Sequence, residues 1–181
     1  MRLETERLTL RPLTIDDLDP LAEFYADEET MRYIGSGVTF DRAQSEASLG
    51  RMLESFEAQG FGQLAVERKE DGAFMGRCGL LVWDESWTPT RLPDADGPVE
   101  IEVGYLLGRA YWGAGYATEA ASAVRDWALE NLELKRLIAL IQPGNEASAG
   151  VARKLGMEPD GEIEIFGKPA TVYALGKRPA R

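Results

Sequence analysis

The chain has 181 residues, a length that predicts a single domain, spanning residues 1–181, with one buried core. With 44% hydrophobic and 28% charged residues, its composition is that of a soluble globular protein and not of a disordered or fibrous one. It contains no histidine and one cysteine, which excludes a Ser–His–Asp triad, a histidine-liganded metal site and an internal disulfide bond. We therefore expect no metal, and any chemistry must use carboxylates, hydroxyls, tyrosines, one thiol or the backbone.

The formal net charge of −11 argues against binding to nucleic acid or to an anionic membrane surface, because both need a basic patch. Residues 1–98 carry 20 acidic and 10 basic side chains, whereas residues 99–181 carry 11 and 10. The second part could therefore receive an anion against little opposing field. Charges interrupt every apolar run of the N-terminus, so we expect no signal peptide, no membrane span and a cytoplasmic protein.

Apolar periodicity and the positions of glycine and proline predict an α+β protein of mixed αβα type. The element order is strand, two helices, three strands, helix, strand, helix and two strands. These elements are expected at about residues 7–13, 14–25, 41–59, 62–68, 74–83, 99–108, 113–131, 136–142, 145–155, 162–165 and 170–175.

Local signals place some of these elements more closely. Thr14 is the expected N-cap of the first helix, with Asp17 at its third position, and Ile15 should lie on the buried face of that helix. The segment 84–98 has the composition of a loop. Tryptophans at 83 and 87 are either exposed aromatic contacts or anchors that hold this loop to the core.

The glycines at 113 and 115 lie where a strand ends and a helix begins. Backbone N–H groups of residues 113–118 would face outward at the positive end of the helix dipole, which suits a pyrophosphate and requires no basic residue. A structural turn is the alternative. The lysine of a P-loop is absent, and Thr118 occupies the place of the third glycine of a dinucleotide-binding fingerprint, so both nucleotide interpretations weaken.

Several short motifs occur in a fixed order along nearly the whole chain. They are ETERLTLRP at 4–12, EVGY at 102–105, GAGYATEA at 113–120, NEAS at 145–148 and KLGM at 154–157. Together they resemble the GNAT acetyltransferases, and within them the RimJ/RimL-like branch of ribosomal-protein and protein N-terminal acetyltransferases. The resemblance implies acetyl-CoA as donor. It also implies a mixed, mostly antiparallel sheet splayed between its fourth and fifth strands, with pantetheine in the gap.

The resemblance also implies which residues hold acetyl-CoA. Backbone amides of Leu106, Leu107 and Gly108 would pair with the pantetheine as an added strand does. The pyrophosphate would be held by amides of Gly113, Ala114, Gly115, Tyr116, Ala117 and Thr118. Asn145 matches the position whose side chain bonds the pantetheine, although Pro-Gly-Asn before a helix is also an ordinary N-cap.

Two positions depart from the family's pattern. Trp112 stands where the phosphate motif usually begins with glutamine or arginine, which removes a side-chain donor. Ala152 stands where many relatives have a tyrosine that acts as general acid. Ser148 is the substitute we expect, because it lies on the same helix face as Asn145, although serine is also common at helix starts.

For the general base, relatives in this branch often have an acid at the position of Glu102. Glu100 lies two residues earlier, on the same side of the strand, and is the second candidate. Carboxylates on a strand face are ordinarily only solvated. Cys78 has no histidine to activate it and is expected to be a buried structural thiol, so the amine should attack the thioester directly in a ternary complex.

The sequence thus predicts an acetyl-CoA-dependent N-acetyltransferase whose acceptor is a primary amine. A protein N-terminus and a small cationic amine both stay open. The acidic first part favours a cationic acceptor, held between the first two helices and the 84–98 loop. The alternative from another class is a non-catalytic acyl-CoA-binding or regulatory domain, which alanine at 152 supports. A homodimer is compatible with the sequence.

Overall fold

A computed structural model describes residues 1–92 and 98–176. Its strands are β1 (Leu3–Glu4), β2 (Leu8–Pro12), β3 (Gln63–Arg68), β4 (Phe74–Trp83), β5 (Pro89–Thr90), β6 (Glu100–Leu107), β7 (Arg136–Ile141), β8 (Glu158–Ile165) and β9 (Lys168–Gly176). The helices are the short 3-10 turns η1 (Ile15–Asp17) and η3 (Arg109–Tyr111), and α1 (Leu18–Ala26), α2 (Glu28–Met31), α3 (Arg42–Gln59), α4 (Tyr116–Asn131) and α5 (Glu146–Lys154). Within the described residues, no helix is long and apolar enough to cross a membrane.

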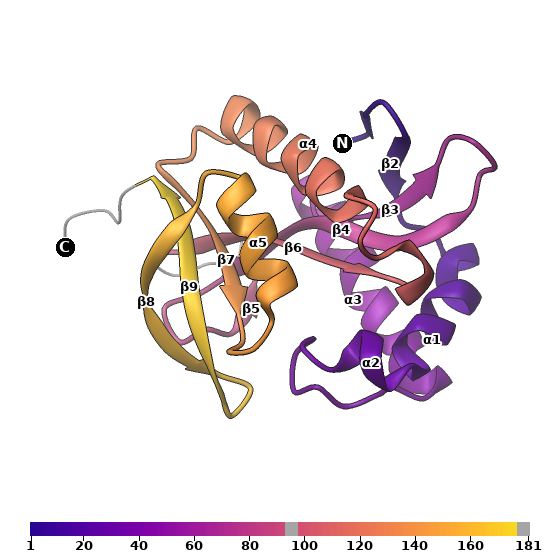
Figure 1. The fold of residues 1–181 in the computed structure, drawn as a ribbon, viewed down its shortest axis with the longest axis horizontal. Coiled ribbons are helices and arrows are strands. Elements are labelled where there is room, and N and C mark those ends of the chain that lie inside the picture. Colours follow the sequence, from indigo (N-terminus) through magenta and orange to yellow (C-terminus); the bar gives the residue numbers. More distant parts are fainter. Residues whose placement is uncertain (93–97, 177–181) are drawn as a thin grey trace.

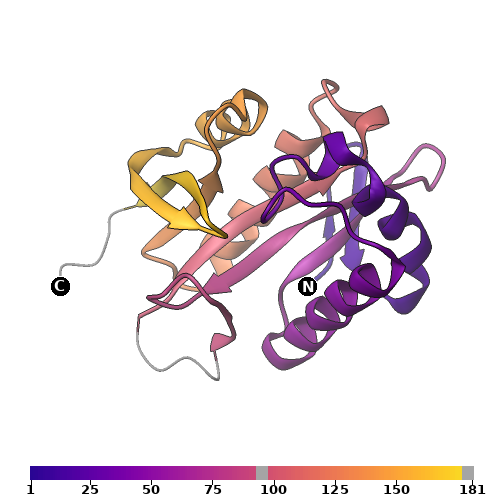
Figure 2. The same ribbon diagram turned by 90° about the horizontal axis from the view of Figure 1, so that it is seen from below.

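The nine strands of the described residues form one sheet in the order β1-β2-β3-β4-β6-β7-β9-β8, with β5 paired to β4. The neighbours are antiparallel, except β6 and β7, which are parallel. Helices cover both faces, with α4 and α5 on one side and α1 and α3 on the other (Figures 1 and 2). The mixed α/β architecture expected from the sequence is confirmed.

The pairing between β6 and β7 is confined to Glu102 and Ile138, so the two strands diverge on either side of this point. These are the fourth and fifth strands of the sequence analysis, and the expected splay is confirmed. Because parallel strands that separate leave backbone groups without a ladder partner, the gap is a natural place for an extended ligand.

Local signals explain where the helices begin and end. Thr14 and Asp17 form the expected capping box. Asp41 caps α3 in the same way, and Gly60 ends it in the left-handed conformation with φ of 73°. Ile15 is 59% exposed, so its predicted burial is wrong. The chain starts this element as a 3-10 turn, which rotates Ile15 away from the apolar face that α1 presents.

The loop after β4 is anchored to the core. Trp83 is 4% exposed, and the partly buried Trp87 packs against clusters of buried residues that include Ile165 of β8 and Ile138 of β7, which confirms the anchoring interpretation. Within this loop, β5 adds a two-residue pairing to β4 that its composition did not predict. Residues 93–97 of the predicted loop lie outside the described residues.

Candidate active site

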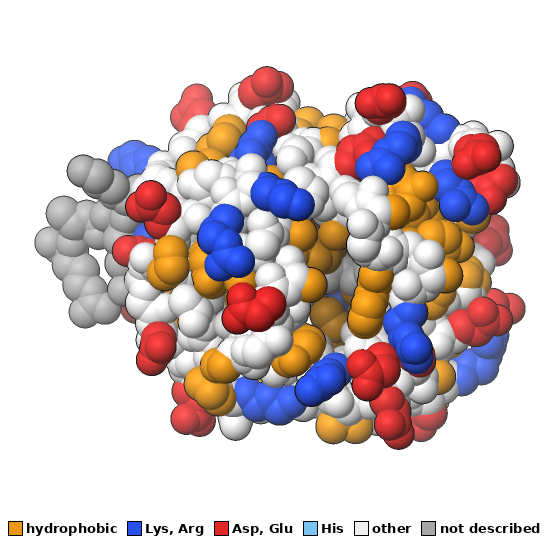
Figure 3. Space-filling view, viewed as in Figure 1, with side chains coloured by type: hydrophobic (Ala, Val, Ile, Leu, Met, Phe, Trp, Pro, Cys, Tyr) orange, Lys and Arg blue, Asp and Glu red, His pale blue; other side chains and the backbone are white. Residues whose placement is uncertain are grey.

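Two cavities open into the gap between β6 and β7. The larger, about 490 Å³, lies among the end of β6, the start of α4 and α5. The smaller, about 270 Å³, lies among β4, β6, β7 and the β8–β9 hairpin. Figure 3 shows the surface hollowed beside α5, with hydrophobic side chains in the hollow. Six residues line both cavities and mark where they meet: Tyr33, Ile34, Tyr105, Asn145, Ser148 and Val151.

The larger cavity contains most of the predicted acetyl-CoA cradle. Its lining includes Leu106, Leu107, Gly113, Gly115, Tyr116, Ala117, Thr118 and Asn145. Gly113 and Gly115 have φ of 75° and 83°, a left-handed conformation that glycine adopts without strain. Gly115 is the N-cap of α4, so the amides that follow it lie at the positive end of this helix.

The glycine loop is held by a residue that the sequence analysis did not single out. Arg7 donates from Nε to Glu119 Oε2 at 2.7 Å and from Nη1 to the Ala114 carbonyl at 3.1 Å. Its guanidinium also lies 4.3 Å from the centroid of the Tyr116 ring. Ala114 is absent from the described lining of the cavity and supplies the carbonyl by which Arg7 fixes the loop. The only signal in the sequence was the position of Arg7 within the N-terminal motif.

Gly108 was predicted to bind acetyl-CoA through its backbone amide, but this amide already has a partner within the protein. Its amide donates to the Met75 carbonyl at 3.0 Å and is therefore not available to a ligand. A Cβ at position 108 would lie 2.5 Å from the Phe24 ring, so this glycine serves packing. A Cβ at Gly76 would lie 2.1 Å from the Leu106 carbonyl oxygen, which shows that the Leu106 backbone also faces β4.

Because backbone groups alternate along a strand, Tyr105 and Leu107 are the residues whose backbone faces the gap. A hydrogen bond shows the orientation of the Leu107 backbone directly, because its carbonyl accepts from Trp112 Nε1 at 2.7 Å. The indole N–H of Trp112 is therefore used within the protein. Pairing of the pantetheine with the backbone of Leu107, as an added strand would pair, remains a prediction. We extend this prediction to the backbone of Tyr105.

Asn145 caps α5. Its Oδ1 accepts from the Ser148 amide at 3.2 Å, which confirms the N-cap interpretation, and it also lines both cavities. Ser148 and Tyr105 both line the two cavities where they meet. Ala152 is 2% exposed and lines the smaller cavity, so this chain has no hydroxyl at the position where the family resemblance implied a tyrosine.

Tyr105 is a candidate that the sequence analysis missed. It lies on β6 and lines both cavities, and burial raises the pKa of its hydroxyl to about 12, with the Ser148 side chain acting in the opposite direction. The phenol is therefore protonated at neutral pH and can donate a proton. Tyr105 was missed because it lies in a strand of mostly apolar residues, EVGYLL, and periodicity alone does not distinguish a core tyrosine from one that faces a cavity.

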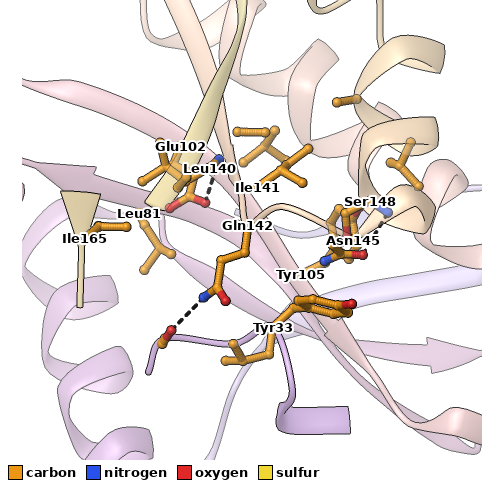
Figure 4. A pocket seen from close by; sticks show the side chains of 18 of the residues that line it. Tyr33, Leu81, Glu102, Tyr105, Leu140, Ile141, Gln142, Asn145, Ser148 and Ile165 are labelled. Atoms are coloured by element: carbon orange, nitrogen blue, oxygen red, sulfur yellow. Dashed lines mark hydrogen bonds between the residues drawn. The ribbon is translucent and has the colours of Figure 1, made fainter. Parts of the chain in front are cut away.

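Glu102 lines the smaller cavity, across from Tyr105 and Ser148, which lie where the two cavities meet (Figure 4). Its Oε2 accepts from Trp83 Nε1 at 2.8 Å and its Oε1 accepts from the Leu140 amide at 3.3 Å. The residue is 8% exposed, and this burial raises the pKa of the carboxyl to about 7, although the two hydrogen bonds act in the opposite direction. Glu102 is therefore suited to accept a proton near neutral pH.

Glu100 occupies a different environment. Its carboxylate pairs with Arg136, with 3.0 Å between Oε2 and Nε, and Arg136 also pairs with Asp160. Among the described residues that line the two cavities, Glu100 is absent. The two glutamates do share a side of β6, but this ion pair gives Glu100 a structural role, and we do not carry it into the catalytic proposal.

Cys78 is completely buried on β4, and burial raises the pKa of its thiol to about 12. A thiol with so high a pKa supplies almost no thiolate at neutral pH. The prediction of a buried structural thiol is confirmed, and direct attack by the amine is favoured over an acetyl-cysteine intermediate.

Two hydrogen bonds tie the segment after α2 across the gap. Gln142 Nε2 donates to the Gly35 carbonyl at 2.8 Å (Figure 4), and the Tyr33 hydroxyl donates to the Gly144 carbonyl at 3.1 Å. These contacts join residues more than a hundred positions apart in sequence, so no local pattern predicts them. They place Tyr33 between the two cavities.

Comparison with known proteins identifies this arrangement. Residues 7–158 match the acetyltransferase (GNAT) domain family. The chain belongs to the GNAT family of acetyltransferases. It is 32% identical over 175 residues to the protein YkkB of Bacillus subtilis (strain 168), covering 95% of this chain and 94% of YkkB.

Solved GNAT structures share its fold. An acetyltransferase from Agrobacterium tumefaciens str. C58 is 32% identical with a TM-score of 0.77, covering 98% of this chain and 95% of that one. RimL, a ribosomal L7/L12 alpha-N-protein acetyltransferase whose structure is in complex with coenzyme A, has a TM-score of 0.75 at 12% identity, with 97% of each chain covered. This GNAT protein is thus an acyltransferase whose fold is that of the RimL-like neighbours.

Proposed function

We propose that this GNAT protein transfers an acetyl group from acetyl-CoA directly to a primary amine in a ternary complex. The observation that carries the proposal is the meeting of the two cavities between a buried carboxyl, Glu102, and the hydroxyl-bearing residues Tyr105 and Ser148, which line both cavities. A donor in one cavity and an acceptor in the other would meet beside groups that can take up and supply a proton.

The larger cavity fits the donor. Its left-handed glycine loop exposes the amides at the start of α4, which suit a pyrophosphate, and the gap-facing backbone of Tyr105 and Leu107 suits the amide groups of pantetheine. RimL binds CoA, and the structure of the acetyltransferase MccE contains acetyl-CoA. The cradle in this chain needs no basic side chain, which agrees with the near-neutral balance of residues 99–181.

The proton balance can be written with the residues present. The amine nitrogen attacks the thioester carbonyl, the carbon–sulfur bond breaks, and the products are an amide and the CoA thiol. Glu102 takes the proton that the amine loses. The departing thiolate takes a proton from the hydroxyl pair of Ser148 and Tyr105, which supplies the function that relatives place at the position of Ala152.

The test is the release of CoA thiol from acetyl-CoA with a panel of primary amines, for wild type, Tyr105→Phe and Ser148→Ala. We expect Tyr105→Phe to lower kcat by about 10- to 100-fold, with the acetyl-CoA Kd within about twofold. Tyr173→Phe is the matched control, because Tyr173 is a buried tyrosine of β9 that is absent from the described lining of both cavities. Tight acetyl-CoA binding without turnover of any amine would favour the non-catalytic acyl-CoA-binding module instead.

A further inference from the structure

We infer that the acceptor is a primary amine carried on a small apolar group, with no second positive charge beside it. This inference rests on the proposed function and narrows its acceptor. It comes from the lining of the smaller cavity, where the amine would have to lie to reach Glu102.

The walls of the smaller cavity are mostly apolar. Trp83 fixes the Glu102 carboxylate with its indole N–H and offers its ring as part of the same wall. Phe166 packs edge-on against Trp83, with 6.0 Å between ring centroids, and is half exposed, so it forms a rim of the cavity. The other apolar side chains of the wall include Leu81, Leu140, Ile141 and Ile165 (Figure 4).

The charges of the cavity suit one ammonium group. Among the described residues of its lining, the charged side chains are Glu102 and Arg77. Arg77 is fixed, because its Nε donates to the Tyr25 hydroxyl at 2.9 Å and its Nη1 donates to Gln63 Oε1 at 2.6 Å. A second ammonium group would meet this guanidinium without a second carboxylate to offset it, which costs free energy in a partly buried site.

Among the described residues of 1–98, no acidic side chain lines this cavity. Several of their carboxylates form surface ion pairs instead, such as Asp19 with Arg42, Asp71 with Arg68 and Glu4 with Lys69. Exposed pairs of this kind are largely screened by solvent. At the site itself, the expected preference for a cation is therefore limited to the attraction between Glu102 and the reacting amine.

The size of the cavity limits the acceptor as well. A volume of about 270 Å³ is slightly below the usual range of ligand pockets, about 300–1,000 Å³, and holds one ring or branched side chain beside the amine. The hydrogen bonds of Gln142 to Gly35 and of Tyr33 to Gly144 close the gap on the side of α2. A free arylalkylamine and the first residue of a polypeptide with an apolar side chain share the required chemistry.

The experiment compares kcat/KM for acetyl transfer to four amines. They are 2-phenylethylamine, ethanolamine, 1,4-diaminobutane and a hexapeptide with N-terminal leucine. We expect 2-phenylethylamine or the peptide to exceed ethanolamine and diaminobutane at least tenfold, and the better of the two identifies the source. A higher value for ethanolamine or diaminobutane overturns the inference but leaves the proposed function standing. No transfer to any amine overturns the proposed function itself.

A variant tests the apolar wall directly. Leu81→Gln should reduce the ratio of kcat/KM for 2-phenylethylamine to that for ethanolamine by about tenfold, because it places a polar group where the ring would lie. Leu129→Gln is the matched control, since Leu129 is a 40% exposed leucine of α4. An unchanged ratio in Leu81→Gln contradicts the inference.

A second measurement needs no variant. In the wild-type protein, 2-phenylethanol keeps the apolar body but lacks the amine. We expect it to inhibit competitively against the amine and not against acetyl-CoA. Inhibition that competes with acetyl-CoA, or none up to the solubility of the alcohol, counts against an apolar acceptor site.

Discussion

Replacing Glu102 with glutamine tests whether this carboxyl is buried strongly enough to act as a base near neutral pH. Burial raises its pKa in the folded protein to about 7 from an ordinary value of 4.5. Between these two pH values the folded protein holds a proton that the unfolded chain has released, so the free energy of unfolding falls as the pH rises. From pH 5 to pH 8 this one group costs the wild type roughly 2.5 kcal/mol of stability.

Glutamine does not ionise, so Glu102→Gln escapes this loss. It carries a different cost, because its amide N–H group faces one of the two donors, Trp83 Nε1 or the Leu140 amide, that the carboxylate accepts. An unsatisfied buried donor costs roughly 1–3 kcal/mol. That cost does not depend on pH, so the comparison between two pH values removes it.

The assay is urea unfolding of wild type, Glu102→Gln and the exposed control Glu164→Gln at pH 5 and pH 8. We expect the stability of Glu102→Gln relative to wild type to rise by roughly 2.5 kcal/mol between the two pH values, and that of Glu164→Gln to change by less than about 0.5 kcal/mol. In parallel, kcat/KM of the wild type should rise with pH through an inflection near 7 that the variant lacks. If the difference in unfolding free energy between Glu102→Gln and wild type is the same at pH 5 and pH 8, the pKa of Glu102 is not raised by burial.

Three further substitutions test the rest of the site. Gly115→Val should weaken acetyl-CoA binding more than about tenfold by calorimetry. Gly72→Val, also at a positive φ and with open space around it, should cost similar stability but leave the Kd unchanged, and equal Kd values would remove the phosphate assignment. Arg7→Ala should weaken acetyl-CoA binding by about three- to tenfold because the glycine loop loses its tie, whereas Arg42→Ala, which breaks an exposed ion pair, should change it less than about twofold. Cys78→Ala should lower the free energy of unfolding by about 1–2 kcal/mol with kcat near wild type; loss of turnover in a folded variant would reinstate a thiol mechanism.

Patterns within one element were enough to predict most of the fold. The 3.6-residue periodicity and caps place α3, with Asp41 and Gly60 at its ends, and a capping box starts the turn at Thr14. The same holds for the glycine loop before α4, because a strand, two glycines and a helix follow one another directly in the chain. Short elements such as β1, α2 and β5 were missed, since two to four residues give no periodicity.

The errors at the site come from contacts between distant parts of the chain. Whether Gly108 or Tyr105 turns its backbone to the gap depends on the register between β6 and β4, which no pattern within β6 specifies. Glu100 and Glu102 point to the same side of β6, so strand alternation does not distinguish them. Arg136, 36 positions from Glu100, decides that Glu100 forms an ion pair. The strand pattern can therefore propose both glutamates but cannot choose between them, and only the family resemblance ranked Glu102 first.

The absence of histidine gives the site a particular electrostatic property. An ordinary histidine has a pKa of about 6.5, and burial brings the pKa of the Glu102 carboxyl into the same range. The two groups differ in sign, because a histidine that is ready to accept a proton is neutral, whereas a carboxylate that is ready to accept one is an anion. Glu102 can therefore attract an ammonium group and, once that group has lost one proton to solvent, accept with the same atoms the proton that the nitrogen loses on attack. The apolar wall around it makes this attraction stronger, since low polarity weakens screening, and an apolar amine body then fits the walls that raise the pKa.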